Sequence, residues 1–131
     1  MIWSDEWSAI RAAAMRRGID PYFVAAIRKT ENGGPGREFG IVSIPAPTFA
    51  EQLRVCCNTV LHFLQSLRPK MTLFQPALGA TRYAYDEAWI GAFANHYAPP
   101  NVANDPRGLN ANWLQNCRAW YAKGQVEFPA I

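Results

Sequence analysis

The chain has 131 residues, a length typical of one domain with a genuine hydrophobic core. Hydrophobic residues make up 50% and charged residues 18%, a composition that excludes a disordered tail. The formal net charge is +3, but basic residues never run longer than two in a row. Because nucleic acid binding usually needs a clustered basic face, no nucleic acid partner is predicted.

The N-terminal sequence MIWSDEWSAIRAAAMRRG has the pattern of an amphipathic helix and not of a signal peptide. No window of the chain approaches the length needed for a membrane span. We therefore expect a chain made in the cytoplasm without a signal peptide. Work outside the cytoplasm would need another route of delivery.

The three cysteines, Cys56, Cys57 and Cys117, form no Cys-x-x-Cys motif. Neither His62 nor His96 lies at metal-ligand spacing from them. The simplest interpretation is that the cysteines are small core residues in a reducing or thiol-tolerant setting. No metal and no other cofactor is predicted.

Hydrophobic residues recur every three or four positions in five stretches, which predicts five helices. In chain order the first four span about residues 4–17, 21–31, 49–67 and 83–97. Asn110 is the predicted N-cap of the last helix.

Two helix starts carry clear local signals. Asp20 followed by Pro21 predicts the start of the second helix, and Thr48 with Glu51 predicts a capping box before the third. The third helix is the best candidate for the central helix of the fold. It carries six apolar positions at spacings of three or four: Phe49, Leu53, Cys56, Val60, Leu64 and Leu67.

The remaining segments are rich in proline and glycine. Residues 68–84 are predicted as loop or short helix, and residues 98–110 as a linker. A short extended or hairpin segment is expected near residues 37–45, with a plain loop as the alternative. The predicted fold is therefore mainly α, a single domain over residues 1–131 with about five helices.

Glu31 lies at the end of the second predicted helix, directly before a glycine-rich stretch at residues 33–36. Ala25, Ala26 and Ile27 precede it, so the carboxylate can lie beside apolar surface, which raises its pKa. The negative end of the helix dipole acts in the same direction. A protonated glutamate can donate a proton to a leaving oxygen, whereas the plainer alternative is a solvated helix end.

The segment FVAAIRKTENGGPGREFGI resembles the catalytic segment of the lysozyme-like superfamily, in particular soluble lytic transglycosylases and phage-type muramidases. In those proteins an apolar helix ends on the catalytic glutamate. A glycine-containing loop follows, and then a Gly-Leu/Ile/Val element that lines the sugar cleft. Ala26, Ile27, Glu31, Gly40 and Ile41 match this pattern in order.

The resemblance implies a lysozyme-like helical domain that cleaves the β-1,4 bond between N-acetylmuramic acid and N-acetylglucosamine in peptidoglycan. It implies that Glu31 is the general acid. The chain departs from the family at Asn32, where the family has serine, and at Val42 and Ser43, where it has methionine and glutamine.

The resemblance also suggests residues that contact the sugar. Phe39, Gly40 and Ile41 match the cleft-lining element. The sequence AFANHY resembles the Ala-x-Tyr-Asn element that faces the catalytic glutamate in transglycosylases, which suggests Asn95 or Tyr97. Core packing or a loop hydrogen bond is an equal alternative for Phe39, Asn95 and Tyr97.

The second catalytic step depends on whether another acid is present. A hydrolase typically uses a second carboxylate, whereas a transglycosylase reuses the same glutamate as a base and attacks with the sugar's own 6-hydroxyl. Glu38 and Asp105 are the candidates for a second acid, and Asp105 is also a candidate substrate-binding residue. A solvated loop charge is the alternative for Glu38, and a turn residue before proline is the alternative for Asp105.

The expected partner is the peptidoglycan glycan strand, reached at the bacterial cell wall after delivery by a phage or a secretion machinery. Phage lysin, virion component and secreted effector remain alternatives, and an inhibitor or delivery partner is compatible with each. The oligomeric state is open. Two other classes are a non-catalytic peptidoglycan-binding or structural module with the same fold, and a small helical interaction domain.

Overall fold

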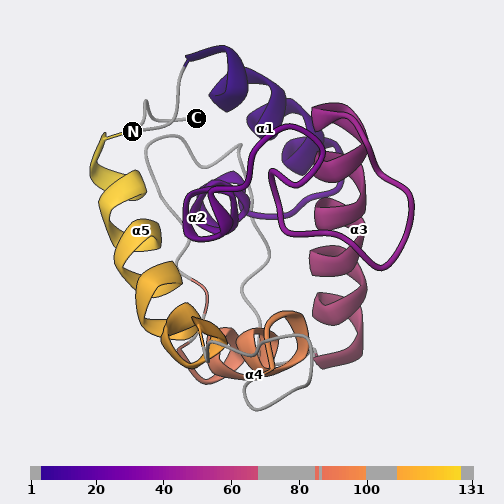
Figure 1. Ribbon diagram of the computed structural model, residues 1–131. Helices are drawn as coiled ribbons and strands as arrows, with labels where there is room; N and C mark the ends of the chain where they lie inside the picture. The colour runs from indigo at the N-terminus through magenta and orange to yellow at the C-terminus, as the bar shows by residue number, and fades with distance from the viewer. Residues whose placement is uncertain (1–3, 68–84, 86, 100–108, 128–131) are drawn as a thin grey trace.

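The computed structural model describes residues 4–67, 85, 87–99 and 109–127. Its helices are α1 (Ser4–Arg16), α2 (Pro21–Glu31), α3 (Phe49–Leu67), α4 (Glu87–Tyr97) and α5 (Trp113–Glu127), with a 3₁₀ turn η2 (Leu109–Asn112) before α5 (Figure 1). The predicted mainly α fold with about five helices is confirmed. Within the described ranges no helix is both long and apolar enough to cross a membrane.

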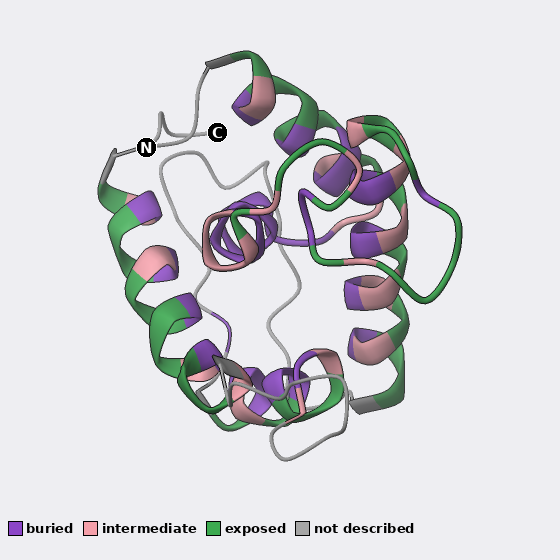
Figure 2. Ribbon diagram, in the orientation of Figure 1, coloured by how far each residue is buried: buried purple, intermediate pink, exposed green. Residues whose placement is uncertain are grey.

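Helix α2 is the centre of the fold. Figure 1 shows it nearly end-on, inside a ring formed by α1, α3, α4 and α5. Eight of its 11 residues are buried, whereas α3 keeps an exposed outer side (Figure 2). The prediction that helix 49–67 is central is therefore wrong. A one-sided apolar stripe indicates a helix on the periphery, and the helix that is apolar around most of its circumference is the buried one.

An aromatic cluster joins α2 to α4 and α5. The ring of Phe23 lies 5.2 to 5.6 Å from the rings of four other residues, centroid to centroid: Tyr85, Trp89, Phe93 and Tyr121. Most of these contacts are edge-to-face, the geometry that aromatic rings prefer. This part of the aromatic content is core packing. Helix α4 begins at Glu87, later than the predicted residue 83, and of residues 83–86 only Tyr85 is described.

The bounds predicted for α2 are confirmed by its caps. Asp20 accepts a hydrogen bond from the backbone N–H of Tyr22, at 2.9 Å. Asn32 ends the helix in the left-handed conformation, with φ of 46°, and its N–H bonds the carbonyl of Arg28. Asparagine tolerates this conformation better than most residues.

The start of α3 follows its predicted signal, whereas that of α5 does not. The hydroxyl of Thr48 accepts the N–H of Glu51 at 3.1 Å, as the capping box predicts. Asn110 lies inside η2 and donates its side-chain amide to the carbonyl of Pro99, so the prediction that it caps the last helix is wrong. Residues 68–84 and most of the predicted linker lie outside the described residues.

The segment near residues 37–45 is a loop, and the expected hairpin is wrong: none of these described residues forms a strand. The buried side chain of Gln52 on α3 takes the place of a partner strand. Its Oε1 accepts the N–H groups of Phe39 and Ile41, at 3.1 and 3.2 Å. Its Nε2 lies 2.9 Å from the carbonyls of Gly36, Ile41 and Ala46. One side chain thus satisfies the backbone groups that a hairpin would have paired.

Candidate functional site

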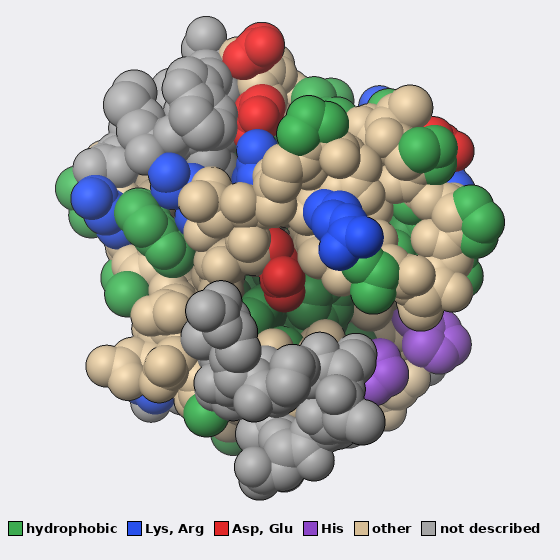
Figure 3. Space-filling view, viewed as in Figure 1, with side chains coloured by type: hydrophobic (Ala, Val, Ile, Leu, Met, Phe, Trp, Pro, Cys, Tyr) green, Lys and Arg blue, Asp and Glu red, His purple; other side chains and the backbone are tan. Residues whose placement is uncertain are grey.

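Glu31 is the last residue of α2, and its side chain is half-buried. Its Oε2 accepts a hydrogen bond from the indole Nε1–H of Trp113, the first residue of α5, at 2.8 Å. Figure 3 shows an acidic side chain near the centre of the same face, over the end of α2, with a hollow lined by hydrophobic side chains beside it. The carboxyl group is therefore oriented by the protein and still reached by solvent.

Gly40 lies against the other oxygen of this carboxyl group. Its φ is +73°, in the left-handed region, and a Cβ added to it would lie 2.3 Å from Oε1 of Glu31. Both facts exclude a side chain at this position without movement of the loop or of Glu31. The glycine of the sequence pattern is thus required by the position of the acid.

The pKa of Glu31 is raised above its ordinary value of 4.5, because burial disfavours the charged form. The hydrogen bond from Trp113 acts in the opposite direction, since it stabilises the carboxylate, but burial has the larger effect. More of this side chain is protonated near neutral pH than of a solvated glutamate. This is the property that a general acid needs.

Tyr97 and Phe39 belong to the surroundings of Glu31, although not as the sequence suggested. The hydroxyl of Tyr97 donates to the backbone carbonyl of Phe39, and its ring lies 5.5 Å from that of Trp113. Tyr97 therefore ties the loop to the residue that holds the acid. The side chain of Phe39 is fully buried and packs against Phe49, so its backbone, and not its ring, faces Tyr97.

Ile41 is half-buried beside the core, and both its N–H and its carbonyl are bonded to Gln52. It follows Gly40 at the point where the loop passes Glu31. The loop thus brings Gly40 against Glu31, and Ile41 follows it in the chain. That these two residues line a sugar cleft stays a prediction.

Glu38 serves its own loop. Its side chain is buried, and its Oε1 accepts the N–H of Gly36 at 3.1 Å. It lines a cavity together with Glu6 and Arg28, while its backbone carbonyl lies 3.4 Å from Arg28. This cavity does not include Glu31. The described contacts of Glu38 are therefore those of a loop anchor, in place of the predicted second catalytic acid.

Asn95 does not join the site. It is exposed on α4 and lines a separate cavity with Ala92, Asn110 and Leu114. Since two helical positions correspond to about 200° of rotation, Asn95 points away from the side of α4 that carries Tyr97. Asp105 lies outside the described residues.

Two residues that sequence analysis did not single out complete the arrangement, namely Trp113 and Gln52. Trp113 follows the hydrophobic spacing of α5 with Cys117 and Tyr121, so nothing local distinguishes it from a core residue. Gln52 had a usable signal. It is a polar residue between Phe49 and Cys56 on the apolar side of α3, and a buried amide must find hydrogen-bond partners.

A second acidic side chain, Asp20, lies at the other end of α2 and is fully buried. Its Oδ2 accepts the hydroxyl proton of Tyr121, and its backbone N–H donates to the hydroxyl of Tyr85 at 2.8 Å. Burial raises its pKa from 3.8 to about 7, although the hydrogen bonds from Tyr121 and Tyr22 act in the opposite direction. This network is internal, and we assign it to the fold.

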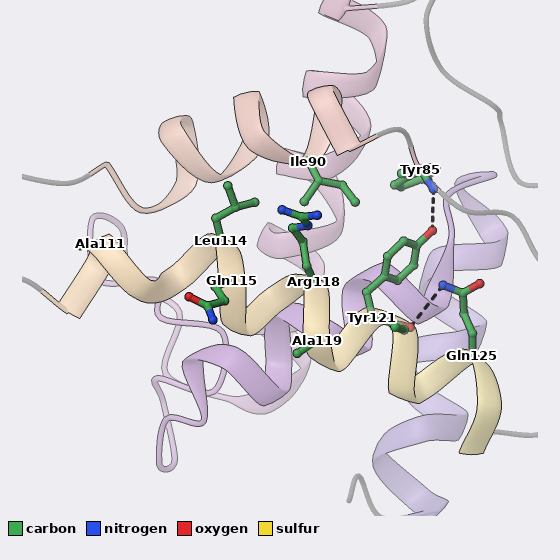
Figure 4. A pocket seen from close by; sticks show the side chains of 10 residues that line it. Tyr85, Ile90, Ala111, Leu114, Gln115, Arg118, Ala119, Tyr121 and Gln125 are labelled. Carbon is green, nitrogen blue, oxygen red and sulfur yellow. Dashed lines mark hydrogen bonds between the residues drawn. The ribbon is translucent and has the colours of Figure 1, made fainter.

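A cavity of about 770 Å³ lies between α4 and α5, lined in part by Tyr85, Ile90, Leu114 and Arg118. Figure 4 shows the hydroxyl of Tyr121 bonded to the backbone nitrogen of Tyr85 at its edge. The hydroxyl groups of Tyr85 and Tyr121 form internal hydrogen bonds, and no carboxylate is among the described lining residues, so we do not place the catalytic site here.

Within the described ranges, no group of three or more histidine, cysteine or acidic side chains could hold a metal ion. Cys56, Cys57 and Cys117 are free and buried, and burial raises the pKa of each thiol. These thiols belong to the hydrophobic core and are poor candidates for nucleophiles.

Comparison of the chain with protein-family models, curated proteins and solved structures gives no match. The geometry around Glu31 and the order of residues in the segment that carries it are therefore the basis of the proposed function.

Proposed function

We propose that the protein cleaves the β-1,4 bond between N-acetylmuramic acid and N-acetylglucosamine in peptidoglycan, with Glu31 as the general acid. The observation that carries this proposal is a half-buried carboxyl group with a raised pKa, held by Trp113 and closely flanked by Gly40. The resemblance of this segment to lytic transglycosylases and muramidases supports the choice of substrate.

The two oxygens of Glu31 have different tasks in this mechanism. Trp113 can only donate a hydrogen bond, so Oε2 is held as an acceptor and the acidic proton belongs on Oε1. Oε1 donates this proton to the glycosidic oxygen as that bond breaks and an oxocarbenium-like centre forms. Trp113 then stabilises the carboxylate that remains.

A lytic transglycosylase fits the described residues better than a hydrolase that uses two acids. In the transglycosylase reaction the Glu31 carboxylate takes the proton of the sugar's 6-hydroxyl, whose oxygen bonds the anomeric carbon and gives an anhydro end. The proton lost in the first step is regained in the second, and no water is consumed. Glu38 is bonded to Gly36 and lines a cavity away from Glu31, which favours this one-acid route.

Digestion of purified peptidoglycan, followed by mass spectrometry of the soluble fragments, tests the proposal. We expect wild-type protein to release fragments that are lighter by one water than hydrolytic products, and Glu31→Gln to release none. Glu38→Gln is the matched control and should release the same products as wild type. Reducing-end fragments would indicate a hydrolase instead. No release by wild type, in a digestion where a control lysozyme works, would leave a non-catalytic wall-binding or structural module.

The proposed substrate implies action at the bacterial cell wall. We infer, as part of this proposal, that a phage or a secretion machinery delivers the protein there.

A further inference from the structure

A buried amide on α3 holds the backbone on both sides of Gly40. The side chain of Gln52 is fully buried, and its Oε1 accepts the N–H groups of Phe39 and Ile41, at 3.1 and 3.2 Å. These two residues are the chain neighbours of Gly40. The Nε2 of the same amide donates to the carbonyl of Ile41, at 2.9 Å. One side chain therefore fixes the backbone before and after this glycine.

Gly40 is the point at which the loop contacts the acid. A Cβ added to Gly40 would lie 2.3 Å from Oε1 of Glu31, and a Cβ lies about 1.5 Å from its Cα, so the Cα of Gly40 is within about 4 Å of this oxygen. That separation is van der Waals contact. The other oxygen, Oε2, accepts the indole N–H of Trp113 at 2.8 Å. The carboxyl group is thus held from two sides, by a hydrogen bond from α5 and by the backbone of the loop.

The loop at residues 33–46 has little rigidity of its own. None of its described residues forms a strand, and its two backbone-bonded turns end at Gly40. The hydroxyl of Tyr97 adds one bond, to the carbonyl of Phe39. Beyond Gly40, the bonds from Gln52 hold the loop in place, because its Nε2 also reaches carbonyls near both ends of the loop.

The titratable neighbours of Glu31 come from three other helices. Cys56 on α3, Tyr97 on α4 and Cys117 on α5 interact with it electrostatically. Burial raises the pKa of each of these groups, so all three are uncharged near neutral pH. The protonation of Glu31 therefore depends mainly on how far solvent reaches its carboxyl group, and the loop at Gly40 covers one side of that group.

We propose that Gln52 is a positioning residue for the proposed reaction, and that it acts on Glu31 through Gly40. This inference rests on the proposed function, because it concerns the geometry of the acid. By fixing the loop, Gln52 limits the orientations of the Glu31 carboxyl group and keeps solvent from one side of it. A catalytic group displaced by about 1 Å can lose up to 10²-fold in rate, so this restraint favours catalysis.

Two variants break the same contact from different sides. Gln52→Met removes the amide and keeps a long side chain in the core. Gly40→Ala, at an exposed position, adds the Cβ that collides with Glu31. Val60→Ala is the matched control, because it removes buried atoms from α3 about 12 Å along the helix from Gln52.

We expect Gln52→Met and Gly40→Ala each to lower the initial rate of peptidoglycan cleavage about tenfold. The double variant should lose little more than either single variant, because both substitutions break one contact. In Gln52→Met the alkaline limb of the pH–rate profile should move to lower pH, since solvent then stabilises the Glu31 carboxylate. Val60→Ala should keep the wild-type profile.

Two NMR signals report the position of the acid without any activity. The carboxyl carbon resonance of Glu31, identified by its absence in Glu31→Gln, gives the pKa by titration. The indole N–H resonance of Trp113 reports the hydrogen bond to Oε2. In Gln52→Met we expect the pKa of Glu31 to fall toward its ordinary value and the Trp113 signal to shift, whereas Val60→Ala should change neither.

Unchanged signals in a folded Gln52→Met, equal changes in Val60→Ala, or additive rate losses in the double variant would overturn the inference. If Gln52→Met does not fold, Gly40→Ala decides, because unchanged signals in that variant would show that the loop does not position the acid. Failure of the proposed function is recognised separately, as the absence of fragments released by wild-type protein. The two NMR signals would then still decide whether Gln52 positions Glu31.

Discussion

Helix α2 carries a carboxyl group at each end, and aromatic residues of α5 bond both. At the N-terminal end, Asp20 is fully buried and each of its oxygens accepts a hydrogen bond, from Tyr22 and from Tyr121. At the C-terminal end, Glu31 is half-buried, and from the described residues its carboxyl group accepts one hydrogen bond, that of Trp113. Both oxygens of Asp20 are therefore bonded by the protein, whereas the Oε1 of Glu31 lies against Gly40 and accepts no hydrogen bond from the described residues.

Burial raises the pKa of both acids, so a raised pKa alone does not distinguish them. The difference lies in the donors and in the helix dipole. The positive N-terminus of α2 stabilises a charged Asp20, whereas its negative C-terminus disfavours a charged Glu31. Asp20, whose two oxygens are both bonded within the protein, is expected to contribute to folding. Glu31, whose Oε1 accepts no hydrogen bond from the described residues, can exchange a proton with a ligand.

The largest difference between the two acids is expected in enzymatic activity, when each acid is replaced by its amide. We expect Glu31→Gln to lower the initial rate of peptidoglycan cleavage by a factor of about 10² to 10⁴, the usual contribution of a general acid. Asp20→Asn should retain most of the wild-type rate, because asparagine also caps a helix. If Asp20→Asn were inactive but still folded by circular dichroism, the assignment of Asp20 to folding and not to catalysis would be wrong.

The pH dependence of stability should come mainly from Asp20, at the N-terminal end of α2. The pKa of Asp20 is about 7 in the fold against 3.8 when solvated, so between these values the folded state binds more protons than the unfolded state. The free energy of unfolding should therefore fall as pH rises from about 4 to about 7, by at most about 4 kcal/mol, and then level off.

Urea denaturation of wild type and Asp20→Asn at several pH values measures this effect. The variant should lose most of the decrease between pH 4 and 7, since asparagine does not titrate. The raised pKa of Glu31 gives a contribution of the same sign, which Glu31→Gln should remove. If the free energy of unfolding still falls between pH 4 and 7 in the Asp20→Asn/Glu31→Gln double variant, other groups cause the decrease.

The two ends of α2 also show what sequence could predict. Asp20 with Pro21 marks the start of α2, and Glu31 followed by Asn32 and glycines marks its end, because caps depend on a few neighbouring residues. The donors that distinguish the two acids come from far along the chain. Trp113 lies 82 residues from Glu31, and Tyr121 lies 101 residues from Asp20.

The loop after α2 was predicted less well for the same reason. The glycine-rich stretch at residues 33–36 indicates a loop after α2, but the direction of that loop depends on Gln52, which belongs to another helix. Glu38 matched a second catalytic acid by its position in the sequence. Its contacts with Gly36 and Arg28 depend on how the loop folds back, which no local pattern encodes.

Replacement of each acid by alanine should distinguish the two ends of α2 by the change in the free energy of unfolding. Asp20→Ala is expected to lower the free energy of unfolding at pH 5 by about 2 to 3 kcal/mol, since it removes a helix cap and leaves the hydroxyl of Tyr121 without its acceptor. Glu31→Ala should change it by less than about 1 kcal/mol, because this half-buried side chain has one hydrogen bond to the part of the chain that the structure describes. Equal losses in urea denaturation would mean that both acids are structural.

The smallest effects are expected from substitution of the two aromatic donors, Trp113 and Tyr121. Trp113→Phe keeps a ring at the site but removes the N–H that stabilises the Glu31 carboxylate, so the pKa of Glu31 should rise further. Activity that depends on protonated Glu31 should then persist to higher pH, and the alkaline limb of the pH–rate profile should move upward. Tyr121→Phe removes the hydroxyl that donates to Asp20. It should lower the free energy of unfolding by about 1 to 2 kcal/mol and leave the pH–rate profile unchanged. If both variants shift the profile alike, the two ends of α2 are coupled, and the distinction between a folding acid and a catalytic acid fails.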